Sequence, residues 1–247
     1  MPSETGFSVG NPDARLRILW LHGYTGAPGA FRTTAERLAQ ELSAFVHVPL
    51  LPGHGTREAD LLGIGFETFV EAARSAARAT KHDGTRFVVI GYSFGGVLAA
   101  EVAHAVGADA LVVALTPFSL PFPASLPGSE RFMALRQFWN KYLTAEDVRE
   151  REGTFYYPDV PGTSLGFVKR GNALLREIVP ALRCPILTLH NEGDPVALPR
   201  SGADLIALQP HDPRSAAHVF PGGRHALFFR PGSEKEYDVL SAFLRQV

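Results

Sequence analysis

The sequence predicts an α/β fold, doubly wound around a mostly parallel sheet of about six to seven strands, with a small helical cap inserted. Short, almost uniformly apolar runs alternate along the chain with longer segments in which apolar residues recur every three or four positions. Apolar runs of this kind are typical of strands that are covered on both faces of a parallel sheet. Strands that alternate with helices indicate right-handed crossovers, which place helices on both faces.

Composition narrows the class of protein. The 247 residues are 45% hydrophobic and 20% charged, which is ordinary for a globular protein. The 24 basic and 25 acidic residues give a net charge of -1, so we expect no nucleic-acid partner. No apolar run approaches the ~18 residues of a membrane span. Residues 1–15 lack the order of a signal peptide, so a cytoplasmic location is expected. The oligomeric state is left open.

Six apolar runs are predicted to form the strands of the sheet: Leu16–Leu21, Phe45–Leu50, Arg86–Ile90, Ala110–Leu115, Pro185–His190 and Ala216–Phe220. Gly6–Gly10 is a candidate for an additional short edge strand. Helical spacing follows three of the strands, with apolar faces at Phe31, Ala35, Leu38 and Leu42, at Phe66, Phe69, Val70, Ala73 and Ala77, and at Tyr237, Leu240, Leu244 and Val247.

One interval breaks this alternation. About 70 residues separate Leu115 from Pro185, and a structureless loop of that length is uncommon in a compact domain. We therefore predict a core domain of residues 1–116 and 183–247 and a cap of residues 117–182, with Ser129–Arg151 and Leu165–Leu182 as its helical parts. Aromatic residues are concentrated in the cap, where they either pack it onto the core or contact a ligand.

The most informative stretch is Gly91-Tyr92-Ser93-Phe94-Gly95, which lies between a predicted strand and a helix rich in small residues. In this context Gly-x-Ser-x-Gly forms a tight turn that exposes the serine hydroxyl above the sheet. The positive end of the following helix points at the same place. Ser93 is therefore predicted to be a catalytic nucleophile rather than a residue of a structural turn.

A serine hydroxyl requires a base, and the base requires an orienting acid. His225 lies in a loop between the last strand and the last helix, whereas His47 and His190 lie within strands and are expected to pack in the core. Asp194 directly follows another strand. The chain order Ser93, Asp194, His225 matches the order expected for such a triad.

Alternatives to this acid remain open. Glu192 is the near competitor of Asp194, and Asp204 and Asp212 are more distant ones. Asp194 itself could be a turn residue before a proline.

Stabilisation of a developing oxyanion requires preorganised donors. One is expected to be the main-chain amide of Phe94, the residue after the nucleophile. The second is predicted to come from the glycine-rich loop after the first long strand, through the main-chain amide of Tyr24 or, as a weaker candidate, of Thr25.

Three motifs, Leu21-His22-Gly23-Tyr24-Thr25-Gly26, Leu51-Pro52-Gly53-His54-Gly55 and Gly91-Tyr92-Ser93-Phe94-Gly95-Gly96, resemble the α/β-hydrolase superfamily, and within it the carboxylesterase and monoacylglycerol lipase group. The resemblance implies a small cap, no cofactor, and hydrolysis of carboxylic esters of short to medium acyl chains or of monoglycerides. It implies a nucleophile, acid and base at Ser93, Asp194 and His225, with the oxyanion held by the main-chain amides of Tyr24 and Phe94. His54 is a minor candidate for pocket shape.

One departure concerns the N-terminus. About 15 residues precede the first parallel strand, so the antiparallel hairpin of the family is expected to be shortened or partly missing.

The uncharged, proline-rich segment after Thr116 predicts a small-molecule ester substrate with an apolar acyl group. The histidines show no metal-binding spacing, so no metal site is expected. Thioester hydrolysis, carbon–carbon bond hydrolysis and perhydrolysis on the same triad are alternatives. A non-catalytic small-molecule binding protein is a further one, although it would not need a complete set of catalytic parts.

Overall fold

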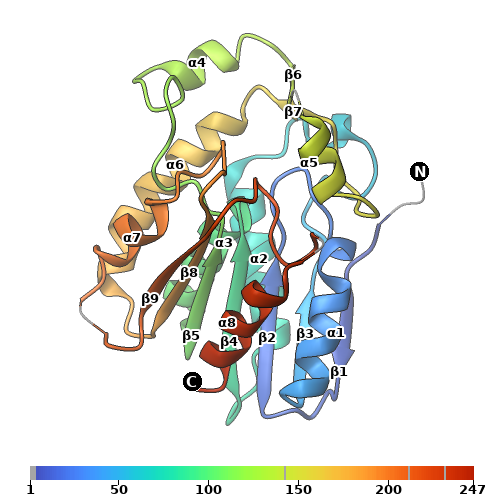
Figure 1. Cartoon of the computed structure of the whole chain (residues 1–247), viewed down its shortest axis with the longest axis vertical. Coiled ribbons are helices and arrows are strands. Elements are labelled where there is room, and N and C mark those ends of the chain that lie inside the picture. Colours follow the sequence, from blue (N-terminus) through green and yellow to red (C-terminus); the bar gives the residue numbers. More distant parts are fainter. Residues whose placement is uncertain (1–3, 142, 211, 231) are drawn as a thin grey trace.

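The computed structural model describes residues 4–141, 143–210, 212–230 and 232–247, and it contains a seven-stranded sheet in the order β1-β3-β2-β4-β5-β8-β9 (Figure 1). The strands of this sheet are β1 (Phe7–Gly10), β2 (Leu16–Leu21), β3 (Ala44–Val48), β4 (Arg86–Tyr92), β5 (Ala110–Ala114), β8 (Ile186–Asn191) and β9 (Ala216–Phe220). All six predicted strands are confirmed. β1 pairs antiparallel with β3, and the other five pairings are parallel.

Burial along the strands follows their place in the sheet. Every residue of β2, β5 and β8 is buried, as continuous apolar sequences require. The edge strands differ, because β1 alternates between half-buried and exposed residues and β9 exposes three of its residues in succession. The strand β1 lies within Gly6–Gly10, where the sequence predicts an edge strand, and its antiparallel partner is β3.

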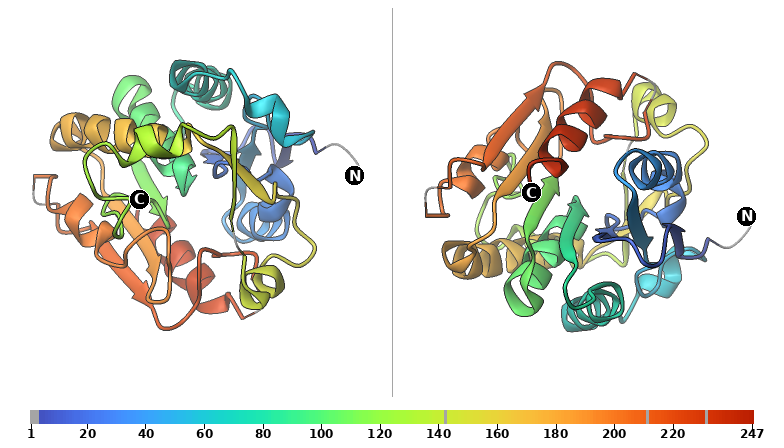
Figure 2. Two further views of the ribbon diagram at one scale, coloured as in Figure 1. Left: turned by 90° about the horizontal axis from the view of Figure 1, so that it is seen from above. Right: turned by 90° about the horizontal axis from the view of Figure 1, so that it is seen from below.

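Helices cover both faces of the sheet, as Figure 2 shows from above and below. The α-helices of the described residues are α1 (Arg32–Glu41), α2 (Phe66–Thr80), α3 (Phe94–Val102), α4 (Ser129–Met133), α5 (Ala145–Glu150), α6 (Ser164–Ile178), α7 (Ser201–Ile206) and α8 (Glu234–Leu244). Of these, α4 and α5 lie beyond the edge of the sheet at which the insertion is located (Figure 1). Side chains of α1 and α8 share one apolar cluster with the sheet, and those of α2, α3 and α6 share the other. The three helical faces predicted from apolar spacing are confirmed in α1, α2 and α8.

The first part of the insertion differs from the prediction. Ser129–Arg151 was expected to be helical, but it contains the short helices α4 and α5 with a strand between them, β6 (Phe138–Asn140). This strand pairs antiparallel with β7 (Asp159–Pro161) about 20 residues further on. The helical prediction is wrong here because a pairing between distant segments outweighs local preference.

The N-terminus of α5 carried a signal in the sequence that the prediction did not use. Thr144 and Asp147 form a capping box, in which the Thr144 hydroxyl accepts from the Asp147 amide at 3.2 Å and the Asp147 carboxylate accepts from the Thr144 amide at 2.8 Å. The pattern Thr-x-x-Asp at 144–147 therefore marks the start of a short helix.

The long helix α6 connects the insertion to the core, and it agrees with the helix predicted at Leu165–Leu182. Leu175 and Ile178 are buried in the cluster formed by α2 and α3. Gly171 packs so closely that a Cβ there would lie 2.9 Å from the Val97 side chain. The C-terminal half of α6 thus covers the sheet, while its N-terminal half contributes to the pocket described below.

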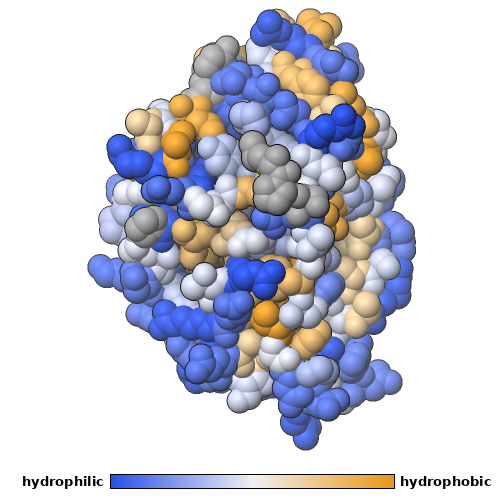
Figure 3. All heavy atoms as spheres, turned by 90° about the vertical axis from the view of Figure 1, so that its right-hand side faces the viewer, coloured by the Kyte–Doolittle hydropathy of each residue, from blue (hydrophilic) through white to orange (hydrophobic). Residues whose placement is uncertain are grey.

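The outer surface of the insertion exposes large apolar side chains, namely Phe122, Leu126, Phe132, Leu135 and Val148. In the space-filling view of Figure 3, hydrophobic atoms stand beside hydrophilic ones at this end of the molecule. No helix within the described residues has both the length and the apolar character needed to cross a bilayer.

Candidate active site

Ser93 occupies a strained turn between β4 and α3. Its backbone has φ 54° and ψ −121°, a conformation that L-residues rarely adopt and that costs of order 1–3 kcal/mol. The turn is tight enough that a Cβ at position 91 would lie 2.3 Å from the Gly95 carbonyl oxygen. A Cβ at position 95 would lie 2.2 Å from the carbonyl oxygen of Leu21 in β2. The two glycines therefore allow the turn, and the turn presents the serine hydroxyl.

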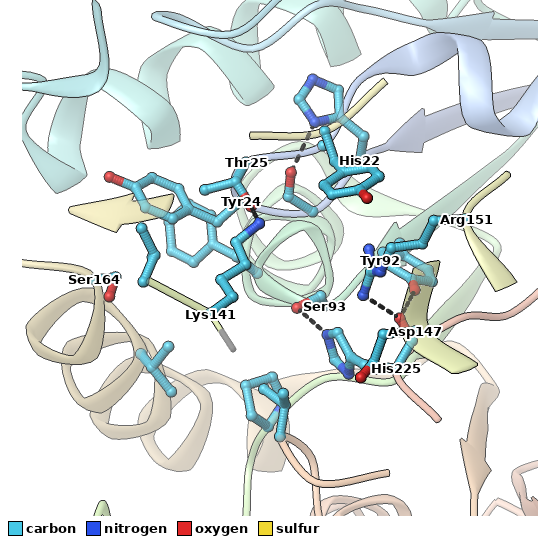
Figure 4. A pocket seen from close by; sticks show the side chains of 18 of the residues that line it. His22, Tyr24, Thr25, Tyr92, Ser93, Lys141, Asp147, Arg151, Ser164 and His225 are labelled. Carbon is cyan, nitrogen blue, oxygen red and sulfur yellow. Dashed lines mark hydrogen bonds between the residues drawn. The ribbon is translucent and has the colours of Figure 1, made fainter. Parts of the chain in front are cut away.

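The structure brings together the three residues predicted to form a triad (Figure 4). His225 lies in the loop after β9, and its Nε2 is 2.9 Å from Ser93 Oγ. Its Nδ1 is 2.7 Å from Oδ2 of Asp194, which follows β8. The other carboxylate oxygen, Oδ1, accepts hydrogen bonds from the amides of Val196 at 2.7 Å and Ala197 at 3.1 Å. Asp194 is thus fixed by its own loop and directed at the imidazole.

Asp194 is suited to remain ionised. Burial acts to raise the pKa of its carboxyl group, but the charge and hydrogen bond of His225 and the two amides outweigh this effect. The pKa of Asp194 therefore lies below its ordinary value. A carboxylate acceptor beside Nδ1 keeps the proton on that nitrogen, which leaves Nε2 free to accept the proton of Ser93.

The competing acids lie elsewhere. Glu192 is exposed beside the loop. Asp204 accepts a hydrogen bond from the Ser119 hydroxyl, and Asp212 pairs with Arg214 at 2.9 Å. The carboxylate that bonds to His225 Nδ1 is that of Asp194, at 2.7 Å, so the structure favours Asp194 among the four carboxylates.

Of the two histidines within strands that are expected to pack in the core, His190 does so and His47 does not. His190 is buried, and its Nε2 lies 3.2 Å from the Thr116 carbonyl oxygen. His47 is half-buried rather than in the core, with its Nδ1 2.8 Å from the Ser8 hydroxyl. The difference arises because β3 has only the short edge strand β1 on its outer side.

The loop after β2 lies against the serine turn. A Cβ at Gly23 would be 3.1 Å from Ser93 Cβ. Thr25 has φ 66°, and its amide donates to His54 Nε2 at 3.0 Å. The amide of Thr25 is therefore already bonded, which favours Tyr24 over Thr25 as the second oxyanion donor.

Two buried histidines hold this loop, a role that sequence analysis missed. His22 Nε2 accepts from the Leu51 amide at 3.0 Å and its Nδ1 lies 2.9 Å from the Gly23 carbonyl oxygen. Burial lowers the pKa of His22 to about 3 and that of His54 to about 4, so both rings are neutral. Each can then donate from one nitrogen and accept at the other. His54 thus supports the loop from behind, which differs from the role in pocket shape expected of it.

A pocket of about 580 Å³ lies over Ser93 and is lined by both the core and the insertion. Many of its lining side chains are apolar, including Phe31, Phe94, Leu143, Leu165, Phe167 and Phe229. Its lining also includes the ionisable side chains of Lys141, Asp147, Arg151 and Arg224. Asp147 pairs with Arg224 at 2.8 Å. Within the described residues, no group of three His, Cys, Asp or Glu side chains could hold a metal ion.

The chain is similar in sequence and in fold to known lipases and lipolytic enzymes. The chain is 27% identical over 191 residues to the thermostable monoacylglycerol lipase of Bacillus sp. (strain H-257), which covers 76% of this chain and 74% of that protein. A solved structure of the metagenome-derived lipolytic enzymes LipS and LipT superposes with a TM-score of 0.81 at 20% identity, covering 100% of this chain and 99% of that one. The Paleococcus ferrophilus monoacylglycerol lipase gives 0.77 at 15% identity, covering 98% of each chain.

The model of the alpha/beta hydrolase family matches residues 18–234, which include the serine turn and the loops of Asp194 and His225. The fold expected from the three sequence motifs is therefore confirmed, and this chain belongs to the alpha/beta hydrolase family.

Proposed function

We propose that the protein is a serine hydrolase that cleaves carboxylic esters with apolar acyl groups of short to medium length. The observation that carries the proposal is the continuous set of contacts from Asp194 through His225 to the Ser93 hydroxyl, with distances of 2.7 and 2.9 Å, at the base of a largely apolar pocket. The names of the relatives, which are lipases and lipolytic enzymes, support the same class of substrate.

In the proposed reaction His225 Nε2 takes the proton of Ser93 as Oγ attacks the ester carbonyl. Asp194 holds the imidazole in the required tautomer and stabilises the imidazolium that forms. His225 then protonates the departing alcohol, which leaves an acyl group on Ser93. A water molecule activated by the same histidine releases the acid and restores the serine.

The negative charge that develops on the carbonyl oxygen requires donors that are already in place. We assign this role to the main-chain amides of Tyr24 and Phe94. The Phe94 amide is the first of α3, so it is not used within the helix, and the positive end of the helix points at the same oxygen. His22 and His54 act as positioning residues, because they hold the loop that carries Tyr24.

The insertion, residues 117–182, is assigned as a cap over the pocket, and residues 1–116 and 183–247 as the core. Leu143, Leu165 and Phe167 of the insertion line the pocket together with Phe31 and Phe229 of the core. An acyl chain bound between them would be shielded from water on both sides. Thioesters and carbon–carbon bonds remain alternative targets of the same triad, and a substrate panel that includes both distinguishes them from 4-nitrophenyl esters.

Labelling with a fluorophosphonate probe tests the proposal. We expect one probe per molecule, mapped to the peptide that contains Ser93, and no labelling of a folded Ser93→Ala variant, because only an activated serine reacts. Wild-type protein should also release 4-nitrophenol from butyrate and hexanoate esters. A folded wild-type protein that neither reacts with the probe nor hydrolyses any ester would refute the assignment and favour a binding protein.

The oxyanion assignment makes a separate prediction. Tyr24→Phe should lower kcat/KM by less than about tenfold, because the variant keeps the main-chain amide and loses one hydroxyl group. Tyr24 packs edge-on against Phe69 and Phe94, with ring centroids 5.8 and 5.7 Å away, and phenylalanine can keep these contacts. Loss of one oxyanion donor costs roughly 2.7–4 kcal/mol of barrier. A several-hundredfold loss in this variant would therefore show that the phenol, not the amide, takes part in the reaction.

A further inference from the structure

Two cationic side chains of the insertion face the pocket over Ser93 and have no role in the proposed reaction. Lys141 follows β6 and Arg151 follows α5, and both line the pocket. In the view of Figure 4 they stand on either side of the Ser93 hydroxyl. The acidic lining residue, Asp147, is paired with Arg224, so it does not neutralise either of them.

Lys141 is held at the oxyanion loop. Its Nζ donates to Thr25 Oγ1 at 2.6 Å and to the Tyr157 carbonyl oxygen. An ammonium group has three N–H donors, and bonds to described residues use two of them. Among the described residues no carboxylate pairs with Lys141. Asp159 and Glu58 influence it from a distance, and both only partly offset its burial and the charge of Arg151.

Arg151 is similarly short of partners. One guanidinium nitrogen donates to the His225 carbonyl oxygen at 2.9 Å, while the buried Nε–H has no hydrogen-bond partner among the described residues. The guanidinium lies 5.5 Å from the centre of the Tyr156 ring, and Lys141 Nζ lies 5.6 Å from the same ring. The ring of Tyr156 therefore links the two cations, and its negative face offsets only a small part of their charge.

Two like charges in one largely apolar pocket are unfavourable without a counter-charge. Burial and the neighbouring charge of Arg151 lower the pKa of Lys141 to about 7, which is the signature of an amine that lacks an anionic partner. A bound anion would supply the missing negative charge and accept hydrogen bonds from N–H groups of both side chains. It would lie within the same pocket as the Ser93 hydroxyl.

We propose that Lys141, Arg151 and Tyr156 form an anion-binding subsite, and that the preferred substrate is an ester that carries a carboxylate group in addition to its apolar chain. The proposal rests on the function assigned above and specifies its substrate class. The carboxylate belongs either to the acyl part or to the alcohol part of the ester, and both would present the same chemistry to the two cations.

Matched pairs of substrates that differ by one negative charge test this subsite. The acyl arm compares the 4-nitrophenyl half esters of adipic and suberic acids with the same compounds capped as methyl esters. The alcohol arm compares 4-butyryloxybenzoate with its methyl ester. In at least one arm we expect wild-type kcat/KM to be about 10- to 100-fold higher for the anionic member below pH 7, where Lys141 is charged.

Variants are compared by the ratio of kcat/KM for the anionic substrate to kcat/KM for its neutral partner. A defect that slows both reactions equally leaves this ratio unchanged. Lys141→Met and Arg151→Met should each reduce the ratio about tenfold or more. Lys169→Met is the matched control, since Lys169 pairs with Glu130 at 2.6 Å outside the pocket lining, and its ratio should equal that of the wild type. A ratio near one in wild-type protein, or one that Lys141→Met leaves unchanged, would overturn the proposal.

The ratio should also depend on pH. Because deprotonation removes the charge of Lys141, the preference for the anionic member should fall as the pH rises through about 7. Besides its burial, the groups that act on Lys141 among the described residues are Arg151, which lowers its pKa, and Asp159 and Glu58, which raise it. Lys141→Arg should keep a preference that no longer declines, because arginine stays protonated. If the preference for the anionic substrate fell with rising pH by the same amount in Lys141→Arg as in the wild type, a group other than Lys141 would be responsible for the pH dependence.

Binding without turnover separates this proposal from the assigned activity. Calorimetry should detect binding of monomethyl suberate to the Ser93→Ala variant. A double variant that also carries Lys141→Met should bind it about tenfold or more weakly. If wild-type protein hydrolyses no ester but this binding behaves as expected, the proposed function fails and the subsite stands. If neutral and anionic esters react equally and the binding is unaffected, the subsite fails and the function stands.

Discussion

Replacing Asp194 with asparagine is expected to lower kcat for ester hydrolysis by about 10⁴-fold without unfolding the protein. The amides of Val196 and Ala197 donate to Oδ1 of Asp194, so the amide oxygen of asparagine would remain at that position. Its NH₂ group would then face His225 Nδ1 and donate to it. The imidazole would carry its proton on Nε2, where it could no longer accept the proton of Ser93.

Glu192→Gln is the matched control, because it makes the same chemical change two residues earlier on an exposed side chain. Its kcat should stay within about twofold of the wild type, as surface substitutions usually have little effect. Steady-state kinetics of both variants, with circular dichroism to verify folding, decide the matter. Comparable losses in the two variants, or a larger loss in Glu192→Gln, would contradict the assignment of Asp194.

Replacement of Gly91 by alanine should prevent the protein from folding or destabilise it by more than about 4 kcal/mol. The added Cβ would lie 2.3 Å from the Gly95 carbonyl oxygen, 2.5 Å from Gly96 Cα and 2.6 Å from Ala99 Cβ. These atoms belong to the start of α3, which is buried between the sheet and α6. Relief of the overlap would require α3 to move away from β4, and with it the Ser93 hydroxyl.

Gly166→Ala provides the comparison, since a Cβ at this position of α6 would meet nothing within 4 Å. Alanine is the better helix former by about 1 kcal/mol, so this variant should be slightly more stable than the wild type. Yield of folded protein and thermal unfolding followed by circular dichroism measure both effects. A Gly91→Ala variant that unfolds at the wild-type temperature would mean that the turn is less tightly packed than the structure describes.

Much of the core followed from local patterns in the sequence. The apolar runs at Leu16–Leu21 and Ala110–Leu115 have few alternatives to a strand buried on both faces, and the structure places both inside the sheet. Gly91 and Gly95 flank Ser93 at a strand-to-helix junction, where only one kind of turn fits. Because parallel strands end at the same edge of the sheet, residues that follow two other strands, Asp194 and His225, could be predicted to meet the serine.

The insertion was less predictable. β6 pairs with β7, and this pairing depends on contacts between segments about 20 residues apart. The spacing of apolar residues within a short stretch of sequence does not indicate such contacts. The same holds for His54, whose ring reaches an amide 29 residues away in the loop after β2. Thr144 and Asp147 are the exception, since their capping pattern can be found in the sequence.

By itself, the sequence determined the family, the order of the strands along the chain and the candidates for nucleophile, acid and base, because these depend on periodicity, turn geometry and chain order. Only the tertiary structure decided which charges face the pocket. Lys141 and Arg151 are 10 residues apart and separately resemble ordinary surface cations. The subsite that we propose depends on the folding of the insertion, which brings both cations beside the Tyr156 ring in the lining of one pocket, where no described carboxylate pairs with Lys141.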